Sequence, residues 1–253
     1  MKWMFAPALA LVVVAPSAAP AGFTNGSFET FTNSANPGVA SQLGNSGTGG
    51  YSSLAGWTIG SGTYGFLMAS GAADTTGSYS PQFNSTFRLW GSNDGGVATL
   101  PASSPDRGNY LALDGASGYR GTGISQTITG LTVGQQYLVT FDWASGQQYN
   151  FNGATNESLQ VSLGNQTQTT ATVQNVSHGF TDWVEQSFVF TADATSSTLN
   201  FLAMSTSGGL PPIVLLDGVT FNAVPEPASL ALVGLGLGVA TLTHRLRRKA
   251  PAA

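Results

Sequence analysis

Short segments of alternating apolar and polar residues place the strongest constraint on the fold of this chain. In residues 134–143, one face of an extended chain would carry Tyr137, Val139, Phe141 and Trp143. The same alternation recurs in three further segments, 158–163, 184–190 and 198–204. Between residues 22 and 223, no segment carries apolar residues at the sustained 3.6-residue spacing of an amphipathic helix. The pattern therefore predicts strands throughout this region.

Further segments fit the same scheme. Residues 109–114 and 124–128 indicate two more strands, and 213–221 is a nearly continuous apolar run around Asp217, as expected for a strand buried on both faces. Turn signals such as Asp114-Gly115 separate the segments at short intervals. Many short strands in one unit predict an all-β fold, most simply a β-sandwich.

Two stretches depart from the strand pattern. Residues 33–53 are polar and glycine-rich, and we interpret them as a loop. Residues 60–108 are mixed, with short aromatic patches at 64–66 and 87–90 among Gly, Ser and Asn. Loops of this length are either functional or disordered.

The N-terminal end has the features of a secretory signal peptide. Lys2 precedes an apolar run from Ala8 to Ala15, and Ala19-Pro20-Ala21 forms a small-residue cleavage site. The alternative, a membrane anchor, needs about 20 apolar residues, and this run is shorter. We therefore expect a signal peptide at 1–21 and an exported domain at 22–223.

The C-terminal end, residues 224–253, has three parts in order. Pro225, Glu226 and Pro227 come first, an uncharged run from Ala228 to Thr243 follows, and a basic cluster closes it that includes Arg245, Arg247 and Arg248. An ordinary membrane anchor is the alternative, since basic residues after an apolar run stay cytoplasmic. The three parts together resemble the PEP-CTERM sorting signal of Gram-negative bacteria that produce exopolysaccharide.

That resemblance implies a route to the cell surface or the extracellular space. In the family, an exosortase in the inner membrane is thought to recognise the Pro-Glu-Pro motif and remove the tail. The hydrophobic sorting helix would hold the protein at the inner membrane only transiently. Whether the tail is cut or retained stays open at this point.

Charge and cysteine content exclude several classes of function. Within residues 22–223 there are eleven Asp and Glu, three Arg and no Lys. This balance argues against nucleic acid, which is bound through basic side chains, and a negative field also repels acidic polysaccharide. With no cysteine in the chain, disulfides, zinc–thiolate sites and cysteine nucleophiles are excluded.

Short motifs at both ends of the expected domain resemble galactose-binding-like jelly rolls, a fold shared by many carbohydrate-binding modules. They are Asn25-Gly26-Ser27-Phe28-Glu29, Gly56-Trp57 and Leu216-Asp217-Gly218-Val219. The resemblance implies a jelly-roll β-sandwich, flanked here by the signal peptide and the hydrophobic sorting helix. Residues 109–115, 124–127 and 209–212 also resemble a group of exported PEP-CTERM proteins with no settled activity.

The jelly-roll resemblance further implies a structural Ca²⁺ that joins the first strand to the last. The matching positions are Glu29 and Asp217, with backbone carbonyls completing the shell. The simpler interpretation is that Glu29 is a surface residue and Asp217 a turn former before Gly218.

Sugar binding in such folds uses aromatic faces together with a few polar side chains. The candidates are Trp57, Tyr64, Trp90, Tyr119 and Tyr149, of which Tyr119 and Tyr149 lie in polar or glycine-rich loops. Trp143 and Trp183 adjoin strands and are expected in the core. For any one aromatic residue, packing in the core is the competing interpretation.

Catalytic motifs are weak. His178 is the single histidine of residues 22–223, no Gly-x-Ser-x-Gly elbow occurs, and the Gly-x-Gly-x-x-Gly match at 60–65 lacks a helix after it. A pair of carboxylates for glycoside hydrolysis stays open. We therefore expect a non-catalytic exported protein that associates with exopolysaccharide. The alternatives are an extracellular glycan hydrolase and a purely structural surface protein.

Overall fold

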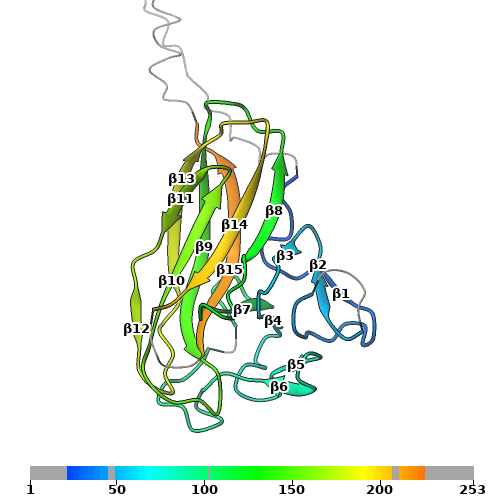
Figure 1. Ribbon diagram of the computed structural model, residues 1–253, viewed down its shortest axis with the longest axis vertical. Coiled ribbons are helices and arrows are strands. Elements are labelled where there is room, and N and C mark those ends of the chain that lie inside the picture. Colours follow the sequence, from blue (N-terminus) through cyan, green and yellow to red (C-terminus); the bar gives the residue numbers. More distant parts are fainter. Residues whose placement is uncertain (1–21, 45–48, 102, 207–210, 226–253) are drawn as a thin grey trace, which may run out of the picture. The chain divides into compact units, whose positions relative to one another are not determined.

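All strand pairs in the described part of the chain are antiparallel. The computed structural model describes residues 22–44, 49–101, 103–206 and 211–225 (Figure 1), and the described residues up to Ala223 belong to one unit. Fifteen strands form within these ranges. In this part of the chain, no helix is long and apolar enough to cross a membrane. The expected signal peptide, residues 1–21, and the expected sorting helix lie outside the described residues.

Two sheets face each other. The first has the order β13 (Val184–Thr191), β9 (Gln136–Gln147), β15 (Pro212–Ala223), β7 (Tyr110–Asp114) and β4 (Gly65–Met68). The second has the order β11 (Gln166–Thr169), β10 (Thr155–Leu163), β14 (Ser196–Met204), β8 (Ile124–Thr129) and β3 (Thr58–Ile59), and β12 (Val173–Asn175) also pairs with β10. Two hairpins stand apart, β1 (Phe31–Asn33) with β2 (Ser52–Leu54) and β5 (Ser78–Ser80) with β6 (Ser85–Phe87).

The pairing order identifies a jelly roll. The roll has eight strands along the chain, β7 to β11 and β13 to β15, and the short β12 beside β10 is an addition to it. The first strand pairs with the last (β7 with β15) and the second with the seventh (β8 with β14). The third pairs with the sixth (β9 with β13) and the fourth with the fifth (β10 with β11). This nested pairing is that of a β-ribbon rolled into two facing sheets. The predicted all-β, jelly-roll sandwich is confirmed.

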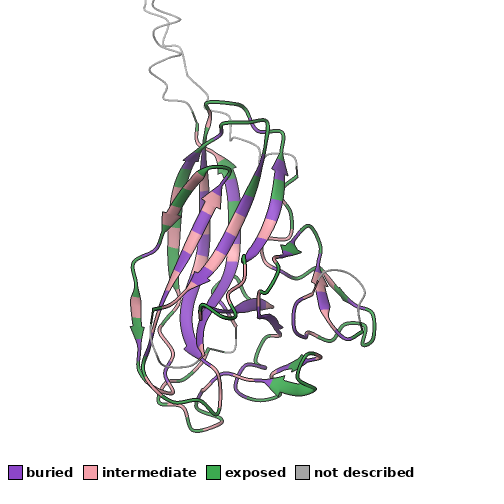
Figure 2. Ribbon diagram, viewed as in Figure 1, coloured by how far each residue is buried: buried purple, intermediate pink, exposed green. Residues whose placement is uncertain are grey.

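The space between the sheets holds the main core, which consists of the large buried side chains of both inner faces. On β9, the alternation expected from the sequence places Tyr137, Val139, Phe141 and Trp143 in it, each 4% exposed or less. Figure 2 shows the corresponding alternation of buried and more exposed positions along the long strands. Burial of these side chains supplies most of the drive to fold.

The first sheet is also covered on its outer face. On β15, Val214 and Leu216 belong to the main core, whereas Ile213 and Leu215 point the other way and join a second apolar cluster. Phe87 and Leu89 come to that cluster from residues 69–101, which we call the cover segment. The second layer explains the burial on both faces of residues 213–217. Beyond the register shift at Asp217/Thr220, burial alternates and Thr220 is exposed, so the expectation for 213–221 holds only for its first part.

The long-loop interpretation of residues 60–108 is corrected by the structure. This stretch contains β4, which is completely buried and pairs with β7, and the β5–β6 hairpin. The short apolar patches of this stretch pack on a sheet face that other strands form. The stretch can therefore be buried there without the alternation of apolar and polar residues that marks a strand in the sequence. In residues 33–53, β1 ends and β2 begins. Between them, the described residues 34–44 and 49–51 form no strand beyond isolated bridges at Ser41, Gln42 and Leu43, in keeping with the expected loop.

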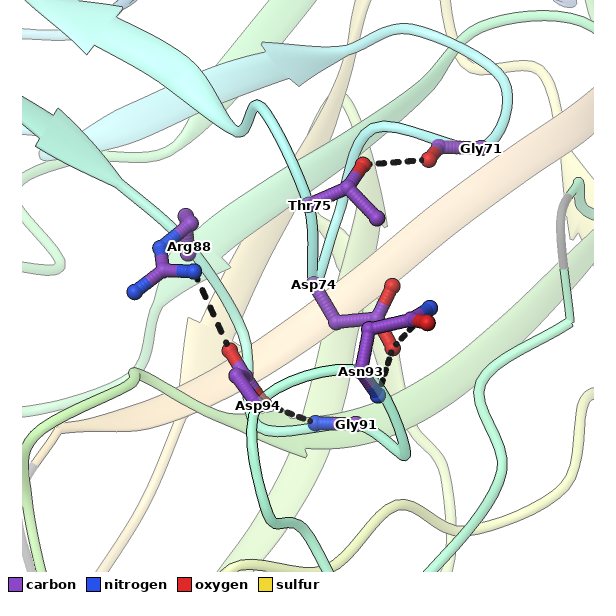
Figure 3. Close-up of polar contacts among 7 residues, drawn as sticks. All are labelled: Gly71, Asp74, Thr75, Arg88, Gly91, Asn93 and Asp94. Carbon is purple, nitrogen blue, oxygen red and sulfur yellow. Dashed lines mark hydrogen bonds and ion pairs between the residues drawn. The ribbon is translucent and has the colours of Figure 1, made fainter.

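Polar contacts hold the cover segment in shape (Figure 3). Asp74 accepts hydrogen bonds from the backbone and side-chain nitrogens of Asn93, both at 3.1 Å, and Asp94 accepts one from the N–H of Gly91 at 2.9 Å. Arg88 forms an ion pair with Asp94 at 3.8 Å. Burial raises the pKa of Asp94. These contacts fix a segment that has little regular secondary structure.

Candidate functional site

A pocket of about 330 Å³ opens at one end of the second layer. It is formed where β7 ends, where β4 and β6 begin, and where the chain leaves β9. Its lining residues are Tyr64, Phe83, Ser85, Asp114, Ala116, Tyr119, Gln148, Phe151 and Pro211. A volume near 300 Å³ is at the small end of ligand pockets, so the space suits a group about the size of one sugar ring.

Aromatic rings form most of the pocket wall. Phe83, Tyr119 and Phe151 are 53%, 50% and 40% exposed, whereas Tyr64 is buried behind them. The ring centroids of Tyr64 and Phe83 are 5.6 Å apart, and those of Tyr64 and Tyr119 are 6.0 Å apart. Three large aromatic side chains exposed around one hollow are uncommon on a soluble surface and indicate a binding site.

A buried carboxylate belongs to the same wall. Asp114, the last residue of β7, is 2% exposed, and its Oδ1 accepts a hydrogen bond from the N–H of Ala116 at 2.7 Å. Burial raises the pKa of this carboxyl group to about 6, and the Ala116 N–H opposes the shift. Ser85 and Gln148 add a hydroxyl and an amide to the lining. The pocket therefore combines stacking faces with convergent polar groups.

Backbone pairing explains why two distant tyrosines meet here. The N–H of Tyr64 donates to the carbonyl of Tyr119 at 2.7 Å, and the N–H of Asp114 donates to the carbonyl of Tyr64 at 3.0 Å. Burial, and more weakly the Asp114 carboxylate, raises the pKa of Tyr64. Of the five aromatic residues expected from the sequence, the structure brings Tyr64 and Tyr119 into this pocket.

Trp90 and Tyr149 form a separate stack next to the pocket. Trp90 stacks on His178 with centroids 3.9 Å apart and meets Tyr149 edge-on at 4.6 Å, and Arg88 lies 4.0 Å from the centre of the Tyr149 ring. These half-buried faces are thus largely engaged within the protein. The Trp90 indole Nε1–H donates to the carbonyl of Phe151 at 2.8 Å, so the stack helps to fix the backbone beside the pocket.

Trp57 does not fit the role expected from the sequence. It is 7% exposed and packs against Phe28 and Phe201 in the main core, with centroids 5.4 Å and 6.0 Å away. Its Nε1–H donates to the carbonyl of Asn25 at 3.0 Å. With its faces and its donor occupied, Trp57 has no face to offer a sugar.

Sequence reasoning missed Phe83, Phe151 and Asp114 as site residues. The sequence marks Asp114 as the end of an expected strand and Asp114-Gly115 as a turn signal, although a carboxylate that ends an apolar strand could have indicated a buried polar group. Phe151 follows the polar loop 147–150, and an aromatic residue in such a loop is the same signal that singled out Tyr149. Phe83 sits in a turn without any motif.

A second group of carboxylates lies where the first and last parts of the domain meet. The N–H of Val219 donates to the carbonyl of Gly26 at 3.0 Å, which ties the N-terminal segment to β15. Asp217 is completely buried, Ser104 donates a hydrogen bond to its Oδ2, and its Oδ1 has no hydrogen-bond partner. Burial raises the pKa of Asp217 to about 8. The hydroxyl of Ser104 and the backbone N–H of Gly218 oppose the shift, and the charges of Asp106 and Glu29 add a smaller contribution to it.

Glu29 is on the exposed side of this group. Its Oε1 and Oε2 accept hydrogen bonds from the backbone and side-chain nitrogens of Asn109, at 2.5 Å and 3.1 Å. Among the described residues, no three His, Asp or Glu side chains converge closely enough to hold a metal ion by themselves. The unpartnered, buried Oδ1 of Asp217 nevertheless fits a cation whose remaining ligands are oxygens of the backbone.

Two family comparisons cover most of the chain beyond residue 83. Residues 84–215 match a family described as "Protein of unknown function (DUF642)". The chain belongs to the DUF642 family. Residues 223–248 of this DUF642 protein match the PEP-CTERM protein-sorting motif, which confirms the predicted sorting signal and marks the chain as an exported protein. Pro225 is exposed two residues after β15, while Glu226, Pro227, Arg245, Arg247 and Arg248 lie outside the described residues.

Solved structures with some similarity to this DUF642 protein include carbohydrate-binding modules. One described as "CBM4 structure and function" has 16% identity and a TM-score of 0.32, covering 79% of this chain and 99% of that chain. The CBM22-1 xylan-binding domain of Paenibacillus barcinonensis Xyn10C has 14% identity and a TM-score of 0.32, covering 64% and 94%. A cyclase from Fischerella sp. TAU has 15% identity and a TM-score of 0.37, covering 68% and 90%. No curated protein matches the sequence. At such low similarity, the fold assignment depends on the strand order given above.

Proposed function

We propose that this protein is a non-catalytic, exported cell-surface or extracellular protein that binds a glycan in the aromatic pocket. The observation that carries the proposal is the pocket itself, where exposed rings of Tyr119, Phe83 and Phe151 surround the buried carboxylate of Asp114. Aromatic faces pack against the apolar faces of sugar rings, while carboxylate, amide and hydroxyl groups pair with sugar hydroxyls. The producing cell's own exopolysaccharide is the proposed partner.

The proposed route to that partner runs through the C-terminal motif. Residues 1–21 would direct export, the sorting helix would hold the chain at the inner membrane transiently, and an exosortase would act at Pro225-Glu226-Pro227. Residues 22–223 contain both apolar clusters and would be released as the folded domain.

Calorimetric titration of the purified exported protein with the exopolysaccharide and with defined oligosaccharides tests glycan binding. Tyr119→Ala and Phe151→Ala should each weaken binding at least tenfold, because each removes a stacking face. Val189→Ala serves as the control, since Val189 is 42% exposed on β13 and does not line the pocket. Binding that survives both pocket variants, or release of shortened sugars during the titration, would contradict the proposal.

We also propose a structural Ca²⁺ held by Asp217 and Glu29. When bound, the ion would supply positive charge for the carboxylate oxygen of Asp217 that has no hydrogen-bond partner. Because the two carboxylates come from the two ends of the domain, binding would stabilise the closed sandwich. Thermal unfolding with calcium and with chelator tests this: calcium should raise the Tm of the native protein and of Asp193→Asn, a surface variant, but not of Asp217→Asn. An equal rise in all three would place the ion elsewhere.

A further inference from the structure

The carboxylate of the aromatic pocket has no cationic partner among the residues around it. Asp114 is 2% exposed and is the one charged side chain among the described residues that line the pocket. Two of the three arginines of residues 22–223 are engaged elsewhere. Arg88 pairs with Asp94 and lies over Tyr149, and Arg120 donates to the sulfur of Met204 at 3.4 Å. A buried carboxylate without a counter-charge is costly, so a ligand that brings positive charge would gain from it.

The rings of the pocket favour the same kind of ligand. Tyr64, Phe83, Tyr119 and Phe151 lie around the carboxylate, and the negative face of an aromatic ring attracts an ammonium group. Several rings around one hollow, with an acid beside them, is the arrangement used to recognise organic ammonium ions. A neutral sugar would use the rings but would leave the charge of Asp114 unbalanced.

We propose that the pocket recognises a positively charged amino group, and that its ligand is a glycan containing an amino sugar with a free amine. The proposal rests on glycan binding at this pocket and narrows the ligand class. The rings would surround the ammonium group and the sugar face, and the carboxylate of Asp114 would pair with the charge. The acid excess of residues 22–223 also favours cationic over anionic glycans.

Three β-1,4-linked pentasaccharides of matched length test the proposal by calorimetry at pH 7: glucosamine with free amines, N-acetylglucosamine, and glucose. The free-amine oligomer should bind at least tenfold more tightly than the other two. Asp114→Asn keeps an oxygen that can accept from the Ala116 N–H, and it should reduce this preference below threefold. Asp193→Asn, which removes an exposed carboxylate in the turn between β13 and β14, should leave the preference unchanged.

The outcomes separate this inference from the proposed function. Equal or tighter binding of the neutral oligomers would overturn the amine preference and leave glycan binding intact. A preference that persists in Asp114→Asn would mean general attraction of cations by an acidic protein, and it would also overturn the inference. Tetramethylammonium carries the positive charge without a sugar, so its binding shows what the cation contributes by itself. If tetramethylammonium binds in an Asp114-dependent way while none of the three oligomers binds, the proposed glycan ligand is wrong. If neither tetramethylammonium nor any oligomer binds, both proposals are wrong.

Discussion

The two faces of the first sheet are both buried, but they are buried by different means. The inner face packs against a second sheet whose strands have the same period of two, and the main core follows directly from alternating residues. The outer face is covered by residues 69–101, which have few strands and depend on loop contacts such as those of Asp74 and Asp94. Regular structure therefore builds the scaffold, whereas the irregular layer contributes Phe83 and Ser85 to a pocket whose other lining residues come from the ends of strands and the loops next to them.

Deleting a ring from the main core should give the largest effect. Phe201 is completely buried and contacts the rings of Phe141 and Trp57, at 5.4 Å and 6.0 Å between centroids. Phe201→Ala should lower the free energy of unfolding by about 3–5 kcal/mol, through lost burial and the cavity left behind. Urea denaturation followed by tryptophan fluorescence checks this. A loss below about 1 kcal/mol would mean that the two sheets are not packed through this residue.

Glu157 breaks the apolar pattern of the main core and should make stability depend on pH. It is completely buried on β10, Ser145 donates to its Oε2 at 2.5 Å, and burial raises its pKa to about 7. Because the folded-state pKa is above the ordinary value of about 4.5, the stabilising contribution is full below pH 4.5 and is lost as pH rises through 7.

Glu157→Gln should remove this contribution of Glu157 to the pH dependence. At pH 8 the variant should be more stable than the native protein by up to about 3 kcal/mol, which is 2.5 pKa units at about 1.36 kcal/mol each. At pH 4.5 the difference should be close to zero. Urea denaturation at pH 4.5 and at pH 8 measures the difference in unfolding free energy between the variant and the native protein. An equal difference at the two pH values would contradict the role given to the buried carboxyl group.

Deleting a ring from the outer layer should have a smaller and more local effect. Phe87 is 1% exposed and stacks on Phe66 at 4.0 Å between centroids. Phe87→Ala should lower the free energy of unfolding by about 2 kcal/mol. This loss is smaller than that expected for Phe201→Ala in the main core, because residues 69–101 can open without the two sheets separating. Hydrogen exchange should show faster exchange in this segment and unchanged exchange in β9 and β14. Loss of protection throughout would make the two layers one cooperative unit.

The smallest effect is expected beside the pocket. Trp90→Phe keeps most of the stacked ring but removes the indole N–H that donates to the carbonyl of Phe151. A single hydrogen bond of this kind contributes about 1 kcal/mol, and the ligand affinity should fall about threefold as Phe151 becomes less fixed. Unchanged affinity would mean that the stack of Trp90, Tyr149 and His178 does not influence the pocket.

The same contrast explains which features the sequence could reveal. Period-two segments such as 134–143 identified the strands of the roll, because a half-buried strand needs alternation. The cover segment has no such period, since it adapts to a surface that strands distant in sequence have already formed. The sequence therefore predicts a loop over residues 60–108 and gives no signal for β4.

The pocket was predictable only in part, for the same reason. Tyr64 and Tyr119 were candidates as aromatic residues in irregular sequence, but so was Trp57, which the structure places in the main core. Nothing local to Asp114 reveals that the chain around Phe83 and Phe151 will come to lie beside it. Residues 83, 114 and 151 converge only through the nested pairing of the strands and the path of the cover segment.

Glycan binding in the aromatic pocket is best tested by a crystal structure of the exported protein with a bound oligosaccharide, chosen by the titrations above. We expect a sugar ring against Tyr119 and Phe151, with its polar or charged group directed at Asp114. A sugar bound instead on the polar outer face of β8, β14 and β10, with the aromatic pocket empty, would contradict it.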